Sequence, residues 1–529
     1  MAGRYDAIIV GGGHNGLVCA AYLAKAGRKV LVLERRHVLG GAAVTEELYP
    51  GFKFSVASYV VSLFRPHIIR ELDLARHGLS MIPLECSFTP HLDGPGLVRW
   101  PELAKTRREI SRLSQKDAEI YPEFSLAMTR MAYFIKNIID RPAPDPTSLA
   151  PSEMARTLEF AKSFARLDPD LFHLHSQLLT MSAVDFLSLW FESEVLMAPM
   201  SCSGIIGTFL GVRSPGTAYV LLHHYMGEID GAFRSWGFHK GGTGGLSLAC
   251  ARAAQSFGVE IRTESSVAQV LVKDGAARGV VLENGDELLS RAVFSNLDPN
   301  RTFLKLVNSS DLDPEFLHQI RRYKLRGSSG KVNLALDRFP EFTCRPGVGP
   351  HVQGDLAICP NLDYLERAYD DAKYGDFSRR PYLNIVFPSL VDPTVAPPGK
   401  HVMSIFVQYA PYHIKEGAAA WPSRRDAFGD AVIDTVAEYA PTLKESILYK
   451  QVLTPWDLEQ TFGLTEGNIF QGELSLEQLM FLRPAAGYAR YRTPIKDLWL
   501  CGSGAHPGGG IMGSPGELAA KTALSAGAV

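Results

Sequence analysis

The strongest constraint on the fold is a glycine motif near the N-terminus, between two apolar runs of four residues. Gly11, Gly13 and Gly16 form the pattern G-x-G-x-x-G, the residues after it repeat apolar side chains with helical spacing, and Glu34 ends the second run. In such a unit the glycines allow a tight turn and a close approach to a pyrophosphate, which the helix N-terminus binds. The terminal acid accepts a hydrogen bond from a ribose hydroxyl. The pattern therefore predicts a βαβ dinucleotide-binding unit.

Length, charge and cysteine spacing limit the remaining classes. The chain has 529 residues, too many for one hydrophobic core, so we expect about two or three domains. The net charge of −2 and the lack of a long basic run argue against a nucleic-acid partner. The seven cysteines form no close pair along the sequence, so we expect neither a metal site nor a redox dithiol. The first expected strand leaves no room for a signal peptide, which predicts a cytoplasmic protein.

A second glycine-dense segment lies near the C-terminus. A short buried strand is expected at 498–501, and a glycine-dense loop at 502–513 leads into a final helix. Ser514 is expected to be the N-cap with Pro515 at the first helical position, and Ser514 with Glu517 matches the S-x-x-E capping box. A helix N-terminus that follows bare backbone is a second site for an anion.

Several stretches occur in the order typical of one enzyme family. They are residues 11–34, the doublet Gly40-Gly41, and residues 236–246, 267–296 and 501–510. In these stretches the chain resembles the phytoene dehydrogenase and carotenoid desaturase family of glutathione-reductase-like flavoproteins, over nearly its whole length. The resemblance implies a non-covalently bound FAD and an α/β fold. That fold is a Rossmann-like FAD-binding domain of the glutathione-reductase-like, amine-oxidase type with an inserted α+β substrate domain.

The resemblance also predicts the domain organisation. The FAD-binding domain is expected to be discontinuous, assembled from residues 1–75, 230–300 and 480–529. The substrate-binding domain is expected to comprise residues 76–229 and 301–479.

Carried over position by position, the family motif predicts the residues that bind FAD. Many relatives have an arginine where this chain has Ala42, and relatives commonly have an aspartate, which accepts from the ribityl chain, where it has Ser503. A serine accepts without the charge, so we expect this contact to be weaker. The predicted cofactor-binding residues are Gly11, Gly13, His14, Asn15, Gly16, Glu34, Arg35, Gly40, Gly41, Ala42, Val267, Gly502, Ser503, Gly510, Ile511 and Met512.

The middle segment predicts a β-meander. Strand-like runs at 267–272 and 279–282 are separated by turn signals at Asp274-Gly275 and Asn284-Gly285. The family lays this meander across the nucleotide domain, and the carry-over places the backbone of Val267 against the adenine. The glycines just upstream suggest a second nucleotide site for NAD(P), but the residues before them do not read as a buried strand, so we expect none.

His506 is the catalytic candidate of the C-terminal loop. It either positions substrate or exchanges a proton, or it is a loop histidine whose nitrogens bond to the backbone. A flavin that accepts a hydride gains negative charge near N1 and O2, so the positive helix terminus after Gly510 is expected to stabilise its reduced form.

An uncharged stretch, Val195–Val212, bears on the substrate. Its length just meets that of a membrane span, but its proline and glycines favour core or the wall of an apolar cavity. With residues 218–226 it supplies more apolar surface than a cofactor domain needs. The family resemblance implies desaturation or isomerisation of an apolar substrate, such as an isoprenoid, a lipid or a related alkene. The apolar surface adds the expectation that this substrate is lipophilic and is reached at or near a membrane surface. Flavin-dependent amine oxidation, or FAD binding that serves a partner or lipid without turnover, are the alternatives.

Overall fold

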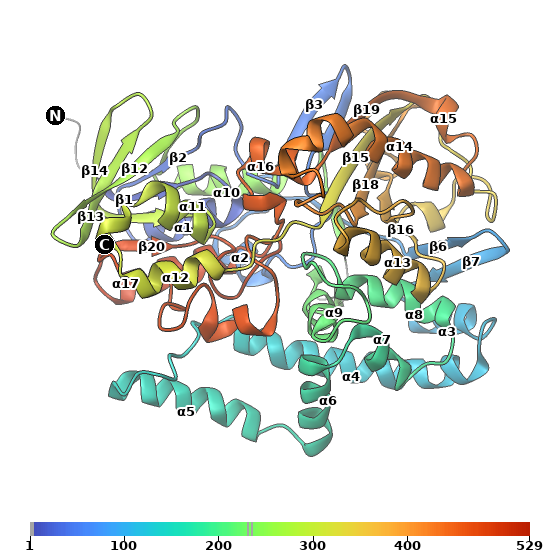
Figure 1. Ribbon diagram of the computed structural model, residues 1–529, viewed down its shortest axis with the longest axis horizontal. Helices are drawn as coiled ribbons and strands as arrows, with labels where there is room; N and C mark the ends of the chain where they lie inside the picture. The colour runs from blue at the N-terminus through green and yellow to red at the C-terminus, as the bar shows by residue number, and fades with distance from the viewer. Residues whose placement is uncertain (1–4, 230–231, 234–235) are drawn as a thin grey trace.

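The computed structural model describes residues 5–229, 232–233 and 236–529, and shows two large sheets side by side with a helical region below the second (Figure 1). The first sheet has the strand order β11-β2-β1-β14-β13-β12, with β20 beside β14. Its strands are β1 (Tyr5–Val10), β2 (Val30–Leu33), β11 (Glu260–Arg262), β12 (Val267–Lys273), β13 (Ala276–Leu282), β14 (Glu287–Ser295) and β20 (Leu498–Leu500).

The predicted βαβ unit and the predicted meander share strand β14. The first half of β14 pairs antiparallel with β13, and its second half pairs parallel with β1, where Ala7 faces Ala292. Strands β2, β11 and β20 extend the parallel part. Helix α1 (His14–Lys25) packs between α10 (Gly244–Ser256) and α17 (Ser514–Ser525), so segments from the start, middle and end of the chain form one core.

The second sheet has the order β19-β15-β18-β17-β16-β6-β7. Alternate residues of its strands point to opposite faces. Val332 and Leu334 pack with helix α14 (Trp421–Tyr439), whereas Lys331 and Asn333 bond to the backbone of residues 55 and 56 in the first domain. The strands are β6 (Ser87–His91), β7 (Gly94–Arg99), β15 (Ser329–Leu336), β16 (Asp355–Ile358), β17 (Tyr382–Val386), β18 (His401–Gln408) and β19 (Ile447–Leu453).

Helices cover the face of the second sheet that looks away from α14. The loop between α4 and α5 is the proline-containing segment 140–150. Helix α5 lies at the lower left of Figure 1, and its Glu153 forms an ion pair with Arg490. The helices that pack there are α3 (Leu103–Ile110), α4 (Gln115–Ile139), α6 (Pro169–Thr180), α7 (Ala183–Ser188), α8 (Glu194–Ser201), α9 (Thr217–Tyr225) and α13 (Leu362–Lys373). Helix α5 (Pro151–Ala165) lies outside the core that these helices form.

The remaining elements are short. The hairpin of β3 and β4 packs its apolar side chains against the second sheet. These elements are α2 (Pro66–Glu71), α11 (Pro299–Arg301), α12 (Pro314–Arg322), α15 (Leu443–Ser446), α16 (Pro455–Phe462), β3 (Thr45–Tyr49), β4 (Phe52–Ser55), β5 (Met81–Pro83), β8 (Glu228–Ile229), β9 (Ala232–Phe233) and β10 (Gly237–His239).

Core packing crosses the predicted boundary at residue 300. Phe303, Phe316 and Ile320 belong to the core under the first sheet, so this core continues to Ile320. The domain limits themselves stay a prediction.

Two local expectations were wrong. The N-cap of α17 is Gly513, in the left-handed region at φ +77°, and Ser514 makes no capping hydrogen bond. The Ser514 hydroxyl donates to Asp140 instead, and the Glu517 carboxylate bonds to His67 and Lys521, so tertiary partners replace the capping box. The residues before α10 do include a short buried strand, β10, but it pairs antiparallel with β5 outside the parallel sheet. It therefore does not form a βαβ unit with α10 like the one at the N-terminus.

The uncharged stretch Val195–Val212 forms core and cavity wall, as expected. It comprises α8 and a 3₁₀ turn, and its buried residues pack in the core under the second sheet. Within the described ranges, no helix is both long and apolar enough to cross a bilayer.

Candidate functional site

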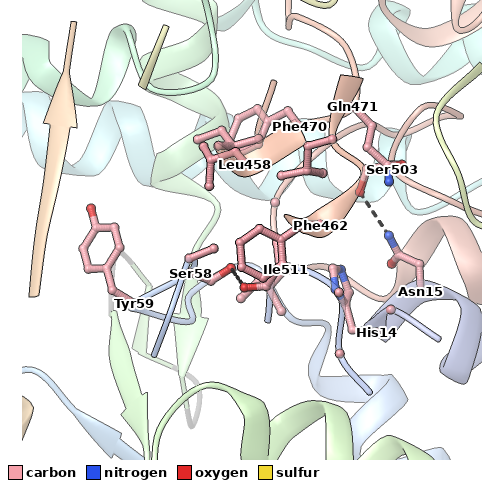
Figure 2. Close-up of a pocket in the computed structure, with 18 of the residues that line it drawn as sticks. His14, Asn15, Ser58, Tyr59, Leu458, Phe462, Phe470, Gln471, Ser503 and Ile511 are labelled. Carbon is pink, nitrogen blue, oxygen red and sulfur yellow. Dashed lines mark hydrogen bonds between the residues drawn. The ribbon is translucent and has the colours of Figure 1, made fainter. Parts of the chain in front are cut away.

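A cavity between the two sheets, named here the central cavity, brings together most of the predicted cofactor-binding residues. Figure 2 shows His14, Asn15 and Ser503 at one end, Tyr59 far from them, and Leu458, Phe462, Phe470 and Ile511 in between. The predicted residues that line it are Gly11, Gly13, His14, Asn15, Glu34, Gly40, Gly41, Ala42, Ser503, Gly510 and Ile511.

Other predicted residues lie close to the central cavity without lining it. A Cβ on Gly16 would lie 2.4 Å from the carbonyl oxygen of Gly11, and one on Gly502 would lie 2.6 Å from that of Asn296. Both glycines are therefore needed for close backbone packing behind the wall. Met512 is fully buried among the core residues of the helical region.

Arg35 and Val267 are also outside the lining. The Arg35 guanidinium donates to the carbonyl oxygens of Gln460 and Thr461, at 3.1 and 2.7 Å, so it joins the end of α16 to the nucleotide domain. Val267 is the first residue of β12. Their contacts with a cofactor stay predictions.

The N-terminus of α1 has the properties of an anion site. Gly13 is its N-cap without a side-chain cap, and the first turn carries no acidic residue. A Cβ on Gly13 would lie 2.8 Å from Asn296 Nδ2, so bare backbone faces the central cavity here. The first backbone N–H groups of this 12-residue helix are therefore free to bind a phosphate.

Glu34 stands at the carboxyl end of β2, where the sequence pattern placed it. Its Oε2 accepts a hydrogen bond from the backbone N–H of Gly12 at 2.8 Å, and its Oε1 accepts from that of Arg36 at 2.9 Å. The carboxylate is buried and lines the central cavity. Each oxygen keeps a further lone pair for a ribose hydroxyl.

His14, Asn15 and Ser503 form the polar end of the central cavity. The Asn15 Nδ2 donates to the Ser503 hydroxyl at 3.0 Å, which leaves Asn15 Oδ1 and His14 Nε2 buried without a hydrogen-bond partner among the described residues. Burial lowers the pKa of His14 to about 4, so its imidazole is neutral at pH 7. Buried polar atoms of this kind require a partner, and a polar ligand supplies one.

Lys331 is the functional candidate that the sequence reasoning missed. It lines the central cavity from β15, is 2 % exposed, and donates from Nζ to the carbonyl oxygen of Ser55 at 2.9 Å. Its ammonium lies 5.4 Å from the centroid of the Tyr59 ring. Burial lowers the pKa of Lys331 to about 7, so its amine gains or loses a proton near neutral pH. The sequence did offer one signal for this residue, because Lys331 is the single charged residue in the otherwise uncharged strand β15.

His506 is not part of the central cavity. Its Nε2 lies 3.1 Å from the carbonyl oxygen of Ile139 and 2.9 Å from that of Arg141, at the end of α4. It lines a separate cavity with residues of α17, and burial lowers its pKa to about 4. His506 is therefore bonded to backbone outside the central cavity, and a catalytic role for it stays a prediction.

Arg483 holds the loop that closes the cavity. The guanidinium is fully buried and donates to carbonyl oxygens of Phe470, Gly472 and Ser503, among others. Arg483 therefore connects the wall residue Phe470 with Ser503 at the polar end. These residues lie in different segments, so no local sequence motif predicts the connection.

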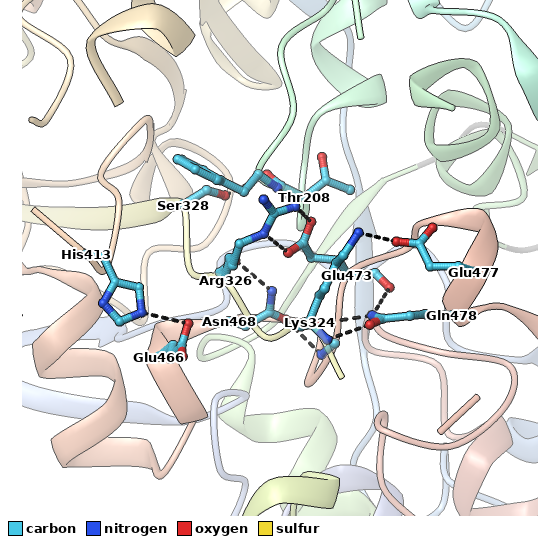
Figure 3. A network of polar contacts seen from close by, with 12 residues as sticks. Thr208, Lys324, Arg326, Ser328, His413, Glu466, Asn468, Glu473, Glu477 and Gln478 are labelled. Atoms are coloured by element: carbon cyan, nitrogen blue, oxygen red, sulfur yellow. Dashed lines mark hydrogen bonds and ion pairs between the residues drawn. The ribbon is translucent and has the colours of Figure 1, made fainter. Parts of the chain in front are cut away.

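A polar network supports the same loop from outside (Figure 3). Arg326 forms a bidentate ion pair with the fully buried Glu473, at 2.6 and 2.9 Å, and its carbonyl oxygen accepts from Asn468. The neighbouring pair of Lys324 and Glu477 is half exposed. The loop that carries Phe470 is therefore tied to the segment before β15.

Cysteines distant in sequence meet in the core. Cys19 lies against Cys501, and Cys202 lies against Cys359. Burial raises the pKa of Cys19 and of Cys202 well above the usual value, which keeps both as neutral thiols. Across the described ranges, no three His, Cys, Asp or Glu side chains are grouped to hold a metal ion.

Comparison with known proteins identifies the family. The family described as "NAD(P)-binding Rossmann-like domain" matches residues 9–72. The structure of wild-type putrescine oxidase bound to putrescine shares the fold, with a TM-score of 0.59 and 16 % identity over 99 % of both chains. A limonene dehydrogenase subunit of Castellaniella defragrans is 27 % identical over 98 % of this chain and 94 % of its own.

The rat pyridine nucleotide-disulfide oxidoreductase domain-containing protein 2 is 41 % identical over 98 % of this chain and 93 % of its own. These findings confirm the resemblance to the phytoene dehydrogenase-like flavoproteins and the Rossmann-like fold class. The chain belongs to the oxidoreductase family of the pyridine nucleotide-disulfide oxidoreductase domain-containing protein 2.

Proposed function

We propose that the chain binds FAD in the central cavity and dehydrogenates or isomerises a mainly apolar substrate. The observation that carries this proposal is that the dinucleotide motif and a hydrophobic wall of the other domain face one cavity. Gly11, Gly13 and Glu34 line one side, and Phe462 and Phe470 line the other. When bound, the flavin supplies the two-electron acceptor, and the chain supplies binding and orientation.

The described residues fit the parts of such a cofactor. The N-terminus of α1 holds the pyrophosphate, and Glu34 accepts from the adenosine ribose. The unpartnered Asn15 Oδ1 and the Ser503 hydroxyl are available to the polar chain that joins pyrophosphate and flavin. The apolar wall excludes water from the reacting end.

Lys331 is the proton carrier in this proposal. Its Nζ lies in the same cavity wall, and its pKa of about 7 lets the amine accept or return a substrate proton near neutral pH. Its hydrogen bond to Ser55 fixes the direction of the amine.

Two relatives support different substrates. The limonene dehydrogenase relative is named for a hydrocarbon alkene, which agrees with the apolar wall. Putrescine oxidase is named for a diamine, which supports amine oxidation as the alternative. The apolar wall formed by Phe462 and Phe470 offers a protonated amine no hydrogen-bond acceptor, so the proposal favours the alkene.

Anaerobic flavin bleaching tests the substrate class. The FAD-loaded protein is mixed with isoprenoids, unsaturated lipids and primary amines, and absorbance near the flavin maximum is followed. Bleaching by an alkene-containing compound is the expected result. Bleaching by amines alone would favour amine oxidation, and no bleaching by any of them would favour a binding role without turnover.

We also propose that the substrate is reached at a lipid surface. Leu149, Met154 and Leu158, in and just before α5, are 84, 54 and 57 % exposed. Flotation with anionic and neutral liposomes tests this. The protein should float with the vesicles, and a variant with serine at the three positions should remain in solution; a wild-type chain that stays in solution contradicts it.

A further inference from the structure

A second cavity, named here the polar chamber, adjoins the central cavity. Its volume is about 290 Å³, and Ile206, His224 and Trp236 line both cavities. The walls come from β6, β16, β17 and α4 and from the turn after α8, that is, from the substrate side of the molecule. A substrate that reacts in the central cavity therefore has space for one of its ends in the polar chamber.

Buried hydrogen-bonding groups line the polar chamber. The Asp355 carboxylate accepts from the Ser87 hydroxyl at 2.7 Å and from Asn384 Nδ2 at 3.1 Å. Asn384 is 3 % exposed, and its Oδ1 has no hydrogen-bond partner in the described part of the chain. An acceptor buried in this way is satisfied when a ligand donates to it.

The charges of the lining balance. Among the described lining residues, Asp355 is acidic and Arg99 is basic. Burial raises the pKa of the Asp355 carboxyl above its ordinary value, although the hydrogen bond from Ser87 and the nearby Arg99 guanidinium oppose this shift. Burial lowers the pKa of His224 to about 4, so this side chain adds no charge at neutral pH. A charged ligand group would meet a like charge as well as an opposite one, so the lining gives it no net attraction to offset its loss of hydration.

We propose that the polar chamber binds an uncharged hydroxyl group at one end of the substrate. A hydroxyl donates one hydrogen bond, here to Asn384 Oδ1, and accepts others, here from groups such as the Arg99 guanidinium. The apolar remainder of the molecule lies toward Ile206 and the central cavity. This assignment rests on the proposed function only in taking the central cavity as the place of reaction.

A head-group series on one skeleton tests the proposal. Geraniol, geranic acid, geranylamine and 2,6-dimethyl-2,6-octadiene are titrated into the purified full-length protein, and binding is measured by calorimetry and by tryptophan fluorescence. The alcohol should bind about ten-fold more tightly than the hydrocarbon, and more tightly than the acid and the amine. Equal affinity of alcohol and hydrocarbon, or preference for a charged head group, would overturn the assignment.

The variant Asn384→Leu locates the effect. It should abolish the preference for the alcohol and leave hydrocarbon affinity unchanged, which a misfolded protein cannot do because it would lose both. Asn137→Leu, on the exposed side of α4, serves as the control and should keep the preference. If Asn384→Leu still prefers the alcohol, the proposed hydroxyl site at Asn384 is wrong.

The FAD content of the same samples separates the two proposals. If the protein contains no flavin but prefers the alcohol, the hydroxyl site in the polar chamber is supported and the proposed function is refuted. If the protein contains FAD but shows no head-group preference, the proposed function is retained and the hydroxyl site is refuted.

Discussion

The Asn15 Nδ2 donates a 3.0 Å hydrogen bond to the Ser503 hydroxyl, across 488 positions of sequence. Asn15 belongs to the first turn of α1, and Ser503 follows the last strand of the first sheet. Both line the polar end of the central cavity. The cavity is therefore complete only when the two ends of the chain have folded together.

This contact predicts coupled mutational effects. Asn15→Ala and Ser503→Ala should each lower the free energy of unfolding by about 1 kcal/mol, since each breaks one buried hydrogen bond. The double variant should cost less than the sum, as measured by urea unfolding. Ser423→Ala, which removes an exposed hydroxyl, is the control. Additive losses would show that the two residues act independently.

Glu34 predicts a specific loss of cofactor affinity. Glu34→Gln should weaken FAD binding about ten-fold or more, because a hydrogen bond to a charged group contributes roughly 1.5–3 kcal/mol. Glu47→Gln is the matched control, since that carboxylate also accepts from a backbone N–H but lies in an exposed hairpin. Fluorescence titration of the apoprotein with FAD gives both affinities. An unchanged affinity for Glu34→Gln would mean that the carboxylate only holds Gly12 and Arg36.

Close packing predicts that Gly16 tolerates no side chain. In Gly16→Ala the new Cβ would lie 2.4 Å from the Gly11 carbonyl oxygen, a backbone atom in the turn below the phosphate site. Overpacking of this kind should lower the free energy of unfolding by about 1–3 kcal/mol and release cofactor. Gly94→Ala places its Cβ in open space and should change stability little. Thermal unfolding with and without FAD distinguishes the two, and equal effects would contradict the packing argument.

Lys331 predicts a pH-dependent stability difference. Its pKa is about 7 in the folded chain against an ordinary value of 10.5, so between these pH values the unfolded state binds more protons. The free energy of unfolding of the wild type, relative to Lys331→Met, should therefore rise with pH by up to about 1.4 kcal/mol per unit in this window. Denaturant unfolding of both proteins between pH 7 and 10 measures the difference. A constant difference would show that Lys331 stays protonated.

Two ion pairs shown in Figure 3 should differ in how much they contribute to the free energy of unfolding. Arg326→Met leaves the fully buried Glu473 without its counter-ion and should lower the free energy of unfolding by roughly 3–5 kcal/mol. Lys324→Met breaks the half-exposed pair with Glu477 and should cost less than about 1 kcal/mol. Similar losses in chemical denaturation would refute the structural role of Glu473.

Local motifs made part of the site predictable. Gly11, Gly13 and Glu34 act within one βαβ unit, so their spacing alone carries the geometry. Lys331 and Asp355 could not be placed in the same way, because the pairing of strands distant in sequence brings them to the cavity walls. The capping box at Ser514 failed for a related reason, since tertiary partners bind both of its polar side chains.

The most direct measurement of the central claim is the identity of the cofactor released when the purified protein is denatured. We expect a yellow protein that releases FAD in a ratio approaching one per chain, and an apoprotein that rebinds FAD with recovery of the flavin spectrum. A colourless protein that cannot be reconstituted with FAD, or one that releases FMN or NAD instead, would contradict it.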